Sequence, residues 1–390
     1  MRQERNHIDL LILLAVLTLM VLSLGVVYSA GSTYFDVKLQ GSGKLLVAHA
    51  VKVLLGLLTI FVVMHIDYHV YRKVTKPVLL SAVILLLITV ALGGEVKGAK
   101  RWLDLGGIGF QPSEFAKYAL LFHLCALIAV KRELIRNFKT GFLPLMIWIG
   151  AVTGLVLLQP NFSTGAMIFA ISVMLLFVGH ARLTHIGATV GALVPLLLVY
   201  MLSAEYRMHR IMTFLNGGGG SGAQANYQSW QGIIGFGNGG IFGLGPGGSR
   251  QRELFLPESY GDFVFSIVGE EYGLIGTLFV VTLFLTILLR GMKIAKHARD
   301  DFGQMLAYGI TGTITLYALI NAGVTLGILP TTGLPMPFVS YGGSSMLFSS
   351  AAVGVLLNIS SQTDLHPRIA GGPDGIRPME PMQLPAQGNA

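Results

Sequence analysis

Cysteine and charged side chains are both scarce in this sequence of 390 residues. The single cysteine, Cys125, excludes an intrachain disulfide and a cysteine metal cluster, and we expect it to pack as a small hydrophobic side chain. Charged residues make up 12% of the chain, about half of the roughly 25% found in soluble domains. Apolar runs of about 20 residues recur instead from end to end. The sequence therefore predicts a polytopic membrane protein.

Acidic residues are fewer than basic ones, and the net charge is +8. A basic chain can bind nucleic acid, but these cations cluster in short segments between apolar runs, which is the pattern of membrane orientation. We expect no nucleic-acid partner. The first apolar run, 8–28, is too long for a signal-peptide core and lacks a small-residue cleavage site, so it is predicted to be a retained span.

The apolar windows predict an all-α fold with about ten transmembrane helices. The third, sixth and seventh are short or contain Gly or Pro, so we expect tilting or a break there. The ten predicted helices cover residues 8–28, 45–64, 78–92, 113–130, 142–158, 164–179, 185–203, 263–289, 303–328 and 340–360.

Lysine and arginine are distributed unequally between the two sides of the predicted bundle. With the N-terminus inside, 16 of them fall in cytoplasmic segments and 9 in outer segments, so both termini are expected in the cytoplasm. We expect residues 1–362 to form one transmembrane domain that includes a large extracytoplasmic loop at 204–262. Aromatic residues between the glycines of this loop favour a folded cap. Residues 363–390, rich in Pro and Gly, are predicted to be a disordered cytoplasmic tail, to which we assign no function.

Four polar motifs interrupt the apolar sequence on the predicted outer side. The first, "GAKRWLDLGGIGFQPSEFAKYALL" (98–121), enters the fourth helix with Glu114 and Lys117 on one helix face. The two can pair, either as a structural ion pair or as functional groups, because ionisable residues at membrane depth mark function by default. The second motif, "LLQPNFSTG" (157–165), is either a tight turn or a functional break.

The third and fourth motifs lie at two further predicted helix entrances. The third, "LPESYGDFVFSIVGEEYG" (256–273), places Asp262 near the start of the eighth helix, where it could be an N-cap or a functional carboxylate. The fourth, "LPTTGLPMPFVSYGGSSM" (329–346), has three prolines and a glycine pair, and such irregular backbone near a membrane is tolerated where it lines a cavity.

The first, third and fourth motifs, in this order, resemble those of the SEDS family (shape, elongation, division and sporulation), the ten-helix peptidoglycan glycosyltransferases that include FtsW and RodA. The resemblance covers residues 8 to about 362, and "YQSWQ" with "GIFGLGPGGSRQRELFLPE" is more similar to the division-type FtsW branch. Two departures stand out. The family usually has an acidic residue at the position of Asn161, and a His-Thr pair where this chain has Tyr260 and Gly261.

The resemblance implies polymerisation of lipid II, in which a sugar hydroxyl attacks an anomeric carbon and expels undecaprenyl diphosphate. Asp262 matches the family's catalytic aspartate, and a carboxylate that takes the hydroxyl proton is the expected device. Charge on the leaving diphosphate needs cations, or a divalent ion such as Mg²⁺ or Mn²⁺. Glu270 and Glu271 are expected to satisfy buried partners. The expected substrate-binding residues are Lys117, Glu114 as its orienting partner, Arg101, Arg250, Glu258, Ser340, Gly342 and Gly343.

Two alternative functions stay open from the sequence. A lipid II flippase also needs many helices and polar breaks, and a division scaffold that recruits a transpeptidase would leave Asp262 dispensable. The resemblance implies a bacterial cytoplasmic (inner) membrane location with the active site facing outside. It also implies a growing glycan strand, a class B penicillin-binding transpeptidase and other divisome membrane proteins as partners.

Overall fold

A computed structural model of the chain describes residues 7–39, 41–96, 99–104, 109–202, 208, 212, 224–256, 259–363 and 365. Two sequence predictions lie outside these residues. They are the role of Glu258 and, apart from Thr363 and Leu365, the disordered tail.

Long helices dominate the fold and follow one another with short connections. The helices are α1 (Leu10–Leu39), α2 (Ser42–Met64), α3 (Tyr68–Leu92), α4 (Pro112–Val130), α5 (Leu143–Leu158), α6 (Phe162–Val178), α7 (Leu183–Leu202), α9 (Gln224–Gly239), α10 (Val264–Lys296), α11 (Asp301–Thr325) and α12 (Gly343–Ser361). Short helical turns are η1 (Leu134–Arg136), η2 (Phe138–Phe142) and η3 (Gln251–Phe255).

Within the described residues, nine helices are long and apolar enough to cross a membrane, and α6 is a shorter apolar helix. The prediction of an all-α, multi-pass membrane protein with about ten membrane helices is confirmed. One small β-sheet was not predicted. Its strands β1 (Gly94–Val96), β2 (Ala99–Asp104) and β3 (Gly109–Phe110) are antiparallel, with Gly94 opposite Trp102 and Leu103 opposite Phe110.

Three predicted helices are longer than the hydrophobic pattern suggested, and the first of them, α1, continues through polar residues to Leu39, beyond its predicted end at residue 28. Helix α3 begins at Tyr68, ten residues before the predicted start, and α10 continues to Lys296. Both extensions carry basic residues that end an apolar window without ending a helix. Pro77 lies inside α3, which continues through it. A break occurs instead in α10 at Gly273, whose φ of 64° and ψ of −159° are not helical.

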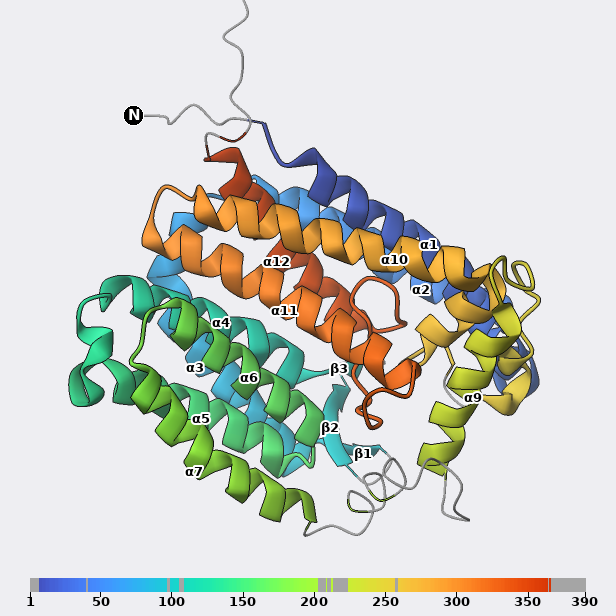
Figure 1. The fold of residues 1–390 in the computed structure, drawn as a ribbon, viewed down its shortest axis with the longest axis horizontal. Coiled ribbons are helices and arrows are strands. Elements are labelled where there is room, and N and C mark those ends of the chain that lie inside the picture. The colour runs from blue at the N-terminus through green and yellow to red at the C-terminus, as the bar shows by residue number, and fades with distance from the viewer. Residues whose placement is uncertain are drawn as a thin grey trace, which may run out of the picture.

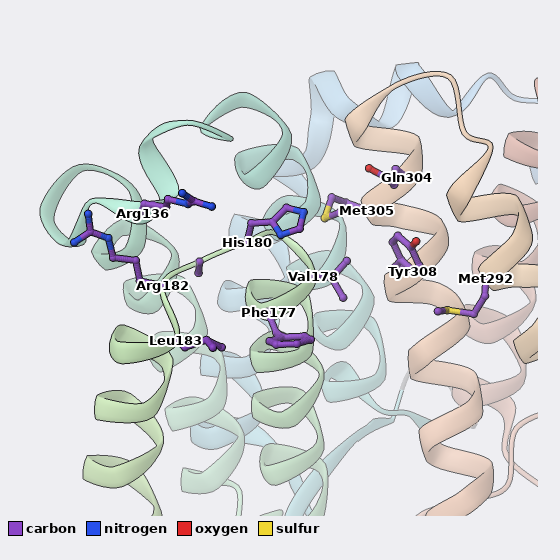
Figure 2. Close-up of a pocket in the computed structure, with 11 residues that line it drawn as sticks. Arg136, Phe177, Val178, His180, Arg182, Leu183, Met292, Gln304, Met305 and Tyr308 are labelled. Carbon is purple, nitrogen blue, oxygen red and sulfur yellow. The ribbon is translucent and has the colours of Figure 1, made fainter.

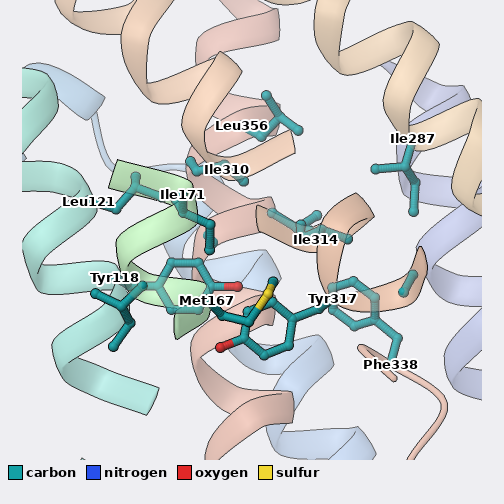
Figure 3. Packing of buried hydrophobic residues seen from close by; sticks show 14 of the residues in the cluster. Tyr118, Leu121, Met167, Ile171, Ile287, Ile310, Ile314, Tyr317, Phe338 and Leu356 are labelled. Carbon is teal, nitrogen blue, oxygen red and sulfur yellow. The ribbon is translucent and has the colours of Figure 1, made fainter. Parts of the chain in front are cut away.

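The helices pack side by side as a bundle (Figure 1). Helix α10 contacts α1 and α11, and α2 contacts α1 and α12, whereas α3 contacts α4 and α5. Helix α11 joins the two groups through α4 and α6. Figure 3 shows the core at this junction, where Tyr118 of α4, Met167 of α6 and Tyr317 of α11 lie close together.

The two ends of the bundle differ. At one end, the backbone N–H of Asp9 donates to the hydroxyl of Ser360 (3.0 Å), and the Arg290 guanidinium pairs with the Asp9 carboxylate (2.6 Å). The start of α1 and the end of α12 therefore meet there. The sheet and α9 lie at the opposite end (Figure 1), where the third and fourth motifs enter α10 and α12.

Candidate functional site

A buried ion pair marks the first turns of α4. The Lys117 ammonium donates to the Glu114 carboxylate at 2.8 Å, and the side chains of both residues are only 3% exposed. Pro112 occupies the first turn of α4, where its missing N–H costs no hydrogen bond. Glu114 therefore points from the first turn to Lys117 one turn later, and the predicted pairing is confirmed.

Helix α11 connects this pair to the third motif. The Lys117 ammonium lies 4.0 Å from the centroid of the Tyr317 ring, which favours a cation through the negative face of the ring. Asn321 follows Tyr317 by four residues and so lies on the same face, about 6 Å further along the helix. Its side-chain amide donates to the backbone oxygens of Asp262 (2.7 Å) and Leu334 (2.8 Å).

Asp262 precedes α10 and does not cap it. The helix begins at Val264 with Phe263 at the N-cap position, so the N-cap interpretation of Asp262 is wrong. One carboxylate oxygen of Asp262 faces Gly333, where an added Cβ would lie 3.3 Å away. Gly333 has a φ of 72°, which glycine adopts without steric cost. The carboxylate is half-buried beside the irregular backbone of the fourth motif.

The fourth motif is folded against the third by backbone contacts. The N–H of Tyr341 donates to the backbone oxygen of Tyr260 (3.0 Å), and the N–H of Met336 donates to the hydroxyl of Ser340 (2.8 Å). Ser340 is buried and closes this turn, so its position is that of a structural support. Burial raises the pKa of Tyr341.

The glycine pair lies where α12 begins. Gly342 is the N-cap residue and Gly343 is the first residue of the helix. The Lys52 side chain passes close to Gly343, and its ammonium lies 3.3 Å from the centroid of the Tyr341 ring. A Cβ at position 343 would make ordinary van der Waals contact with the Lys52 side chain.

The first motif contacts both the fourth and the second. The N–H of Gln111 donates to the Ser344 hydroxyl (3.0 Å), and the Arg101 guanidinium donates to the backbone oxygen of Pro160. Next to Pro160, the buried Asn161 has a side-chain nitrogen with no hydrogen-bond partner. The second motif is thus a turn, as one interpretation predicted, and Arg101 ties it to the same end of the bundle.

Two predicted site residues are not connected to this cluster by the contacts described. Arg250 is exposed, immediately before η3, and Glu258 lies outside the described residues. Four residues joined the cluster without having been assigned a role: Asn321, Tyr317, Lys52 and Tyr341. Asn321 and Lys52 could have been found from the sequence, because a single amide or ammonium side chain within an apolar helix is a signal of function.

The remaining acids of the third motif hold the glycine-rich segment. Glu270 accepts hydrogen bonds from the Asn238 amide (3.1 Å), the Ser249 hydroxyl and the Gln251 N–H (3.1 Å). Glu271 accepts from the Ser29 hydroxyl of α1. Both acids are buried, and the prediction that they satisfy buried partners is confirmed.

The break in α10 brings the backbone of the glycine-rich segment against the helix. The N–H of Leu244 donates to the backbone oxygen of Glu270 (2.9 Å), and the N–H of Leu274 donates to the backbone oxygen of Gly240 (2.9 Å). A Cβ at Gly243, whose φ is 83°, would overlap the backbone of Glu271. Part of the predicted loop at 204–262 is therefore a folded cap that includes α9 and η3.

The arrangement places one half-buried carboxylate beside a turn. The paired Lys117 is linked to it through Tyr317 and Asn321, which lie one turn apart on α11. Such a carboxylate can take a proton, and lysine and arginine can bind an anion. Among the described residues, no group of three or more His, Cys, Asp and Glu side chains is positioned to hold a metal ion. We derive no step through a metal.

The chain matches known proteins over most of its length. The family model of the cell cycle proteins FtsW, RodA and SpoVE matches residues 9–365. A probable peptidoglycan glycosyltransferase FtsW of Geobacter metallireducens is 37% identical over 362 residues, which are 92% of this chain and 96% of the relative.

Solved structures show the same fold. A chain of a peptidoglycan synthase complex that coordinates polymerization and crosslinking matches with a TM-score of 0.75 and 25% identity, over 90% of this chain and 97% of that one. The rod shape determining protein RodA of Thermus thermophilus matches with a TM-score of 0.67 and 25% identity, over 90% of this chain and 96% of that one.

Proposed function

The chain belongs to the FtsW/RodA/SpoVE family of cell cycle proteins, and we propose that it is a peptidoglycan glycosyltransferase that polymerises lipid II during cell division. The observation that carries this function is the meeting of the motifs around Asp262. Asn321 of α11 holds the backbone of Asp262, and Tyr317, one turn earlier, contacts Lys117. The division role follows the FtsW-named relative, which is 37% identical.

Asp262 is the general base in the proposed reaction. The 4-hydroxyl of the acceptor sugar loses its proton to the Asp262 carboxylate as its oxygen bonds to the anomeric carbon of the donor. The bond from that carbon to the diphosphate oxygen breaks, and the electron pair leaves with undecaprenyl diphosphate. A positioned base of this kind contributes about 10²- to 10⁴-fold in rate.

Cationic side chains stabilise the departing diphosphate. Lys117 is the buried candidate, held by Glu114, and Arg101 and Arg250 are the outer ones. Lys52 joins them because it lies beside Gly343 and Tyr341. Preorganised cations at a developing anion supply most of the transition-state stabilisation in such displacements. Ser340, Gly342 and Gly343 shape the wall that presents these groups to the substrate.

Orientation follows from the Lys and Arg distribution. The protein is a multi-pass membrane protein, and the excess of cations at the end opposite Asp262 supports cytoplasmic termini and an outer active site. In this proposed orientation the reaction takes place on the outer face of the bacterial inner membrane, where lipid II is polymerised. The matched synthase complex concerns both polymerization and crosslinking, which supports a class B transpeptidase, a growing glycan strand and other divisome proteins as partners.

The decisive test is polymerisation of purified lipid II by the full-length chain, with and without a class B transpeptidase. We expect glycan strands of several disaccharides, more in the presence of the partner. Transport of lipid II across vesicles without polymer would favour the flippase alternative instead. Absence of both activities, with stable binding of the transpeptidase, would identify a scaffold.

A further inference from the structure

A separate cavity of about 690 Å³ lies at the other end of the bundle. Figure 2 shows it between α6 and α7 on one side and α10 and α11 on the other. Gln304, near the start of α11, lines the cavity, whereas Asn321 of the same helix supports Asp262. At 1.5 Å per residue these two positions are about 25 Å apart. The cavity is therefore distinct from the proposed catalytic site.

One half of the cavity is cationic. Arg136 of η1 and Arg182, which precedes α7, both line it and are exposed. None of its lining residues is acidic. Asp301 lines a small adjoining pocket and is ion-paired with Arg132. The lining therefore presents two guanidinium groups without a carboxylate among them, which suits a phosphate ligand.

The other half is apolar and faces sideways from the bundle. Phe177 of α6 and Leu183 of α7 are 60% and 66% exposed, and Met292 of α10 is 37% exposed. Figure 2 shows Phe177 and Leu183 on the helices below the arginines. On helices that cross a membrane, such a face contacts acyl chains. A ligand that satisfies both halves has an anionic head and an apolar tail.

His180 adds a backbone observation at the same place. Its φ is 61°, the left-handed conformation that ends α6, where the N–H of His180 donates to the Phe177 oxygen (3.1 Å) and the N–H of Ala181 donates to the Leu176 oxygen (3.0 Å). Figure 2 shows its ring between the two arginines and the α11 side of the cavity. The turn between α6 and α7 is thereby bent so that Arg182 and the start of α7 line the cavity.

We propose that this cavity binds the phosphate headgroup of an anionic glycerophospholipid, with Arg136 and Arg182 on the phosphate and the acyl chain along Phe177 and Leu183. In the orientation proposed above, the lipid comes from the cytoplasmic leaflet. The chain's own C-terminal segment is a poorer match, because residues 366–390 contain two acidic residues and two arginines. The lipid's negative charge complements the cationic half of the cavity, and its acyl chain complements the apolar half.

The test is lipid binding to the purified full-length chain, followed by native mass spectrometry. Phosphatidylglycerol and phosphatidylcholine with the same acyl chains are compared for the parent, for Arg136→Gln/Arg182→Gln and for Lys293→Gln/Lys296→Gln. The control lysines are exposed on the same end of α10 but do not line the cavity. We expect phosphatidylglycerol to bind the parent and the lysine variant about tenfold more tightly than phosphatidylcholine, and this preference to vanish in the arginine variant.

Two further arms separate the possible sources of the phosphate. Glycerol phosphate, the headgroup without chains, should not displace the lipid at equal concentration, and Leu183→Ser should weaken phosphatidylglycerol binding. His180→Asn keeps a residue that tolerates positive φ, so the variant should fold and reveal the contribution of the imidazole. Equal binding of the two lipids to the parent, or an unchanged preference in the arginine variant, would overturn the proposal. Displacement by glycerol phosphate would show a soluble-phosphate site instead.

Discussion

The side-chain amide of Asn321 donates to the backbone oxygen of Asp262 at 2.7 Å and to that of Leu334 at 2.8 Å. One residue near the C-terminal end of α11 thus holds two separate motifs at fixed spacing. Because the contacts are to backbone, they position the Asp262 carboxylate without touching it. Asn321 is therefore a positioning residue in the proposed mechanism.

Replacing Asn321 with Ala should reduce polymerisation by at least about tenfold while the chain still folds. Two buried carbonyl groups lose their donor, at a cost of about 1–3 kcal/mol each, and the Asp262 segment is released. Thr313→Val is the matched control, because it removes a buried hydrogen bond to Gly309 on the same helix, away from the site. Initial rates at saturating and limiting lipid II should show a fall in kcat with little change in KM. An equal loss in the control would reduce Asn321 to a general stabilising role.

Removing one member of the Glu114–Lys117 pair should damage folding as well as activity. A single Lys117→Met leaves an uncompensated buried carboxylate, at a cost of about 3–5 kcal/mol. The double variant Glu114→Gln/Lys117→Met removes both charges, so membrane yield and thermal stability should recover. Polymerisation should not recover, because the ammonium that faces the diphosphate is absent. Restored activity in the double variant would show that the pair is structural only.

The glycine-rich cap should depend on Gly243 far more than on Gly240. Both have positive φ, 83° and 52°, so alanine at either position carries a similar backbone cost of about 1–2 kcal/mol. A Cβ at Gly243 overlaps the backbone of Glu271, whereas a Cβ at Gly240 meets nothing within 4 Å. Gly243→Ala should therefore lower the melting temperature of the purified protein clearly more than Gly240→Ala. Equal shifts would mean that the cap does not pack closely on α10.

The proposed orientation can be checked by cysteine labelling in a Cys125→Ala background. Thr184, beside the lipid cavity, and Glu253, in η3, are both exposed and lie at opposite ends of the bundle. A membrane-impermeant maleimide should label Glu253→Cys in intact cells and Thr184→Cys only after the membrane is opened. The reverse pattern would invert the topology and move the active site inside.

Much of the fold was predictable because lipid imposes a long, simple pattern. Ten apolar windows matched ten helices to within a few residues, except where polar residues extended α1 and basic residues extended α3 and α10. The break at Gly273 was not predictable, because it depends on backbone hydrogen bonds with residues 240–245 that are distant in sequence. The short sheet at 94–110 was not predictable either, because its strands are too short to show a clear alternation of apolar and polar residues.

The site was predictable where its residues lie in one contiguous motif. It was not predictable where the contacts join residues that are distant in the sequence. Glu114 and Lys117 were paired from their spacing alone, since three residues on a helix bring two side chains together. Asn321 lies 59 residues beyond Asp262, and no local pattern relates the two. For Ser340, its place in a motif suggested substrate binding, which stays a prediction, while its hydroxyl also accepts a hydrogen bond from the N–H of Met336.

The last prediction concerns the carboxylate itself. Asp262→Asn keeps the size of the side chain, and its backbone oxygen still accepts from Asn321, so folding and membrane level should match the parent. The amide cannot take the acceptor hydroxyl's proton, and polymerisation should fall by about two orders of magnitude or more. Lipid II binding, which depends on the cations and the lipid, should change little.

Glu253→Gln, which neutralises an exposed carboxylate nearby in the sequence, should leave the rate unchanged. The measurements are glycan product and lipid II binding for the parent and both variants at matched protein levels. Polymerisation by Asp262→Asn within a few-fold of the parent would remove Asp262 from the mechanism.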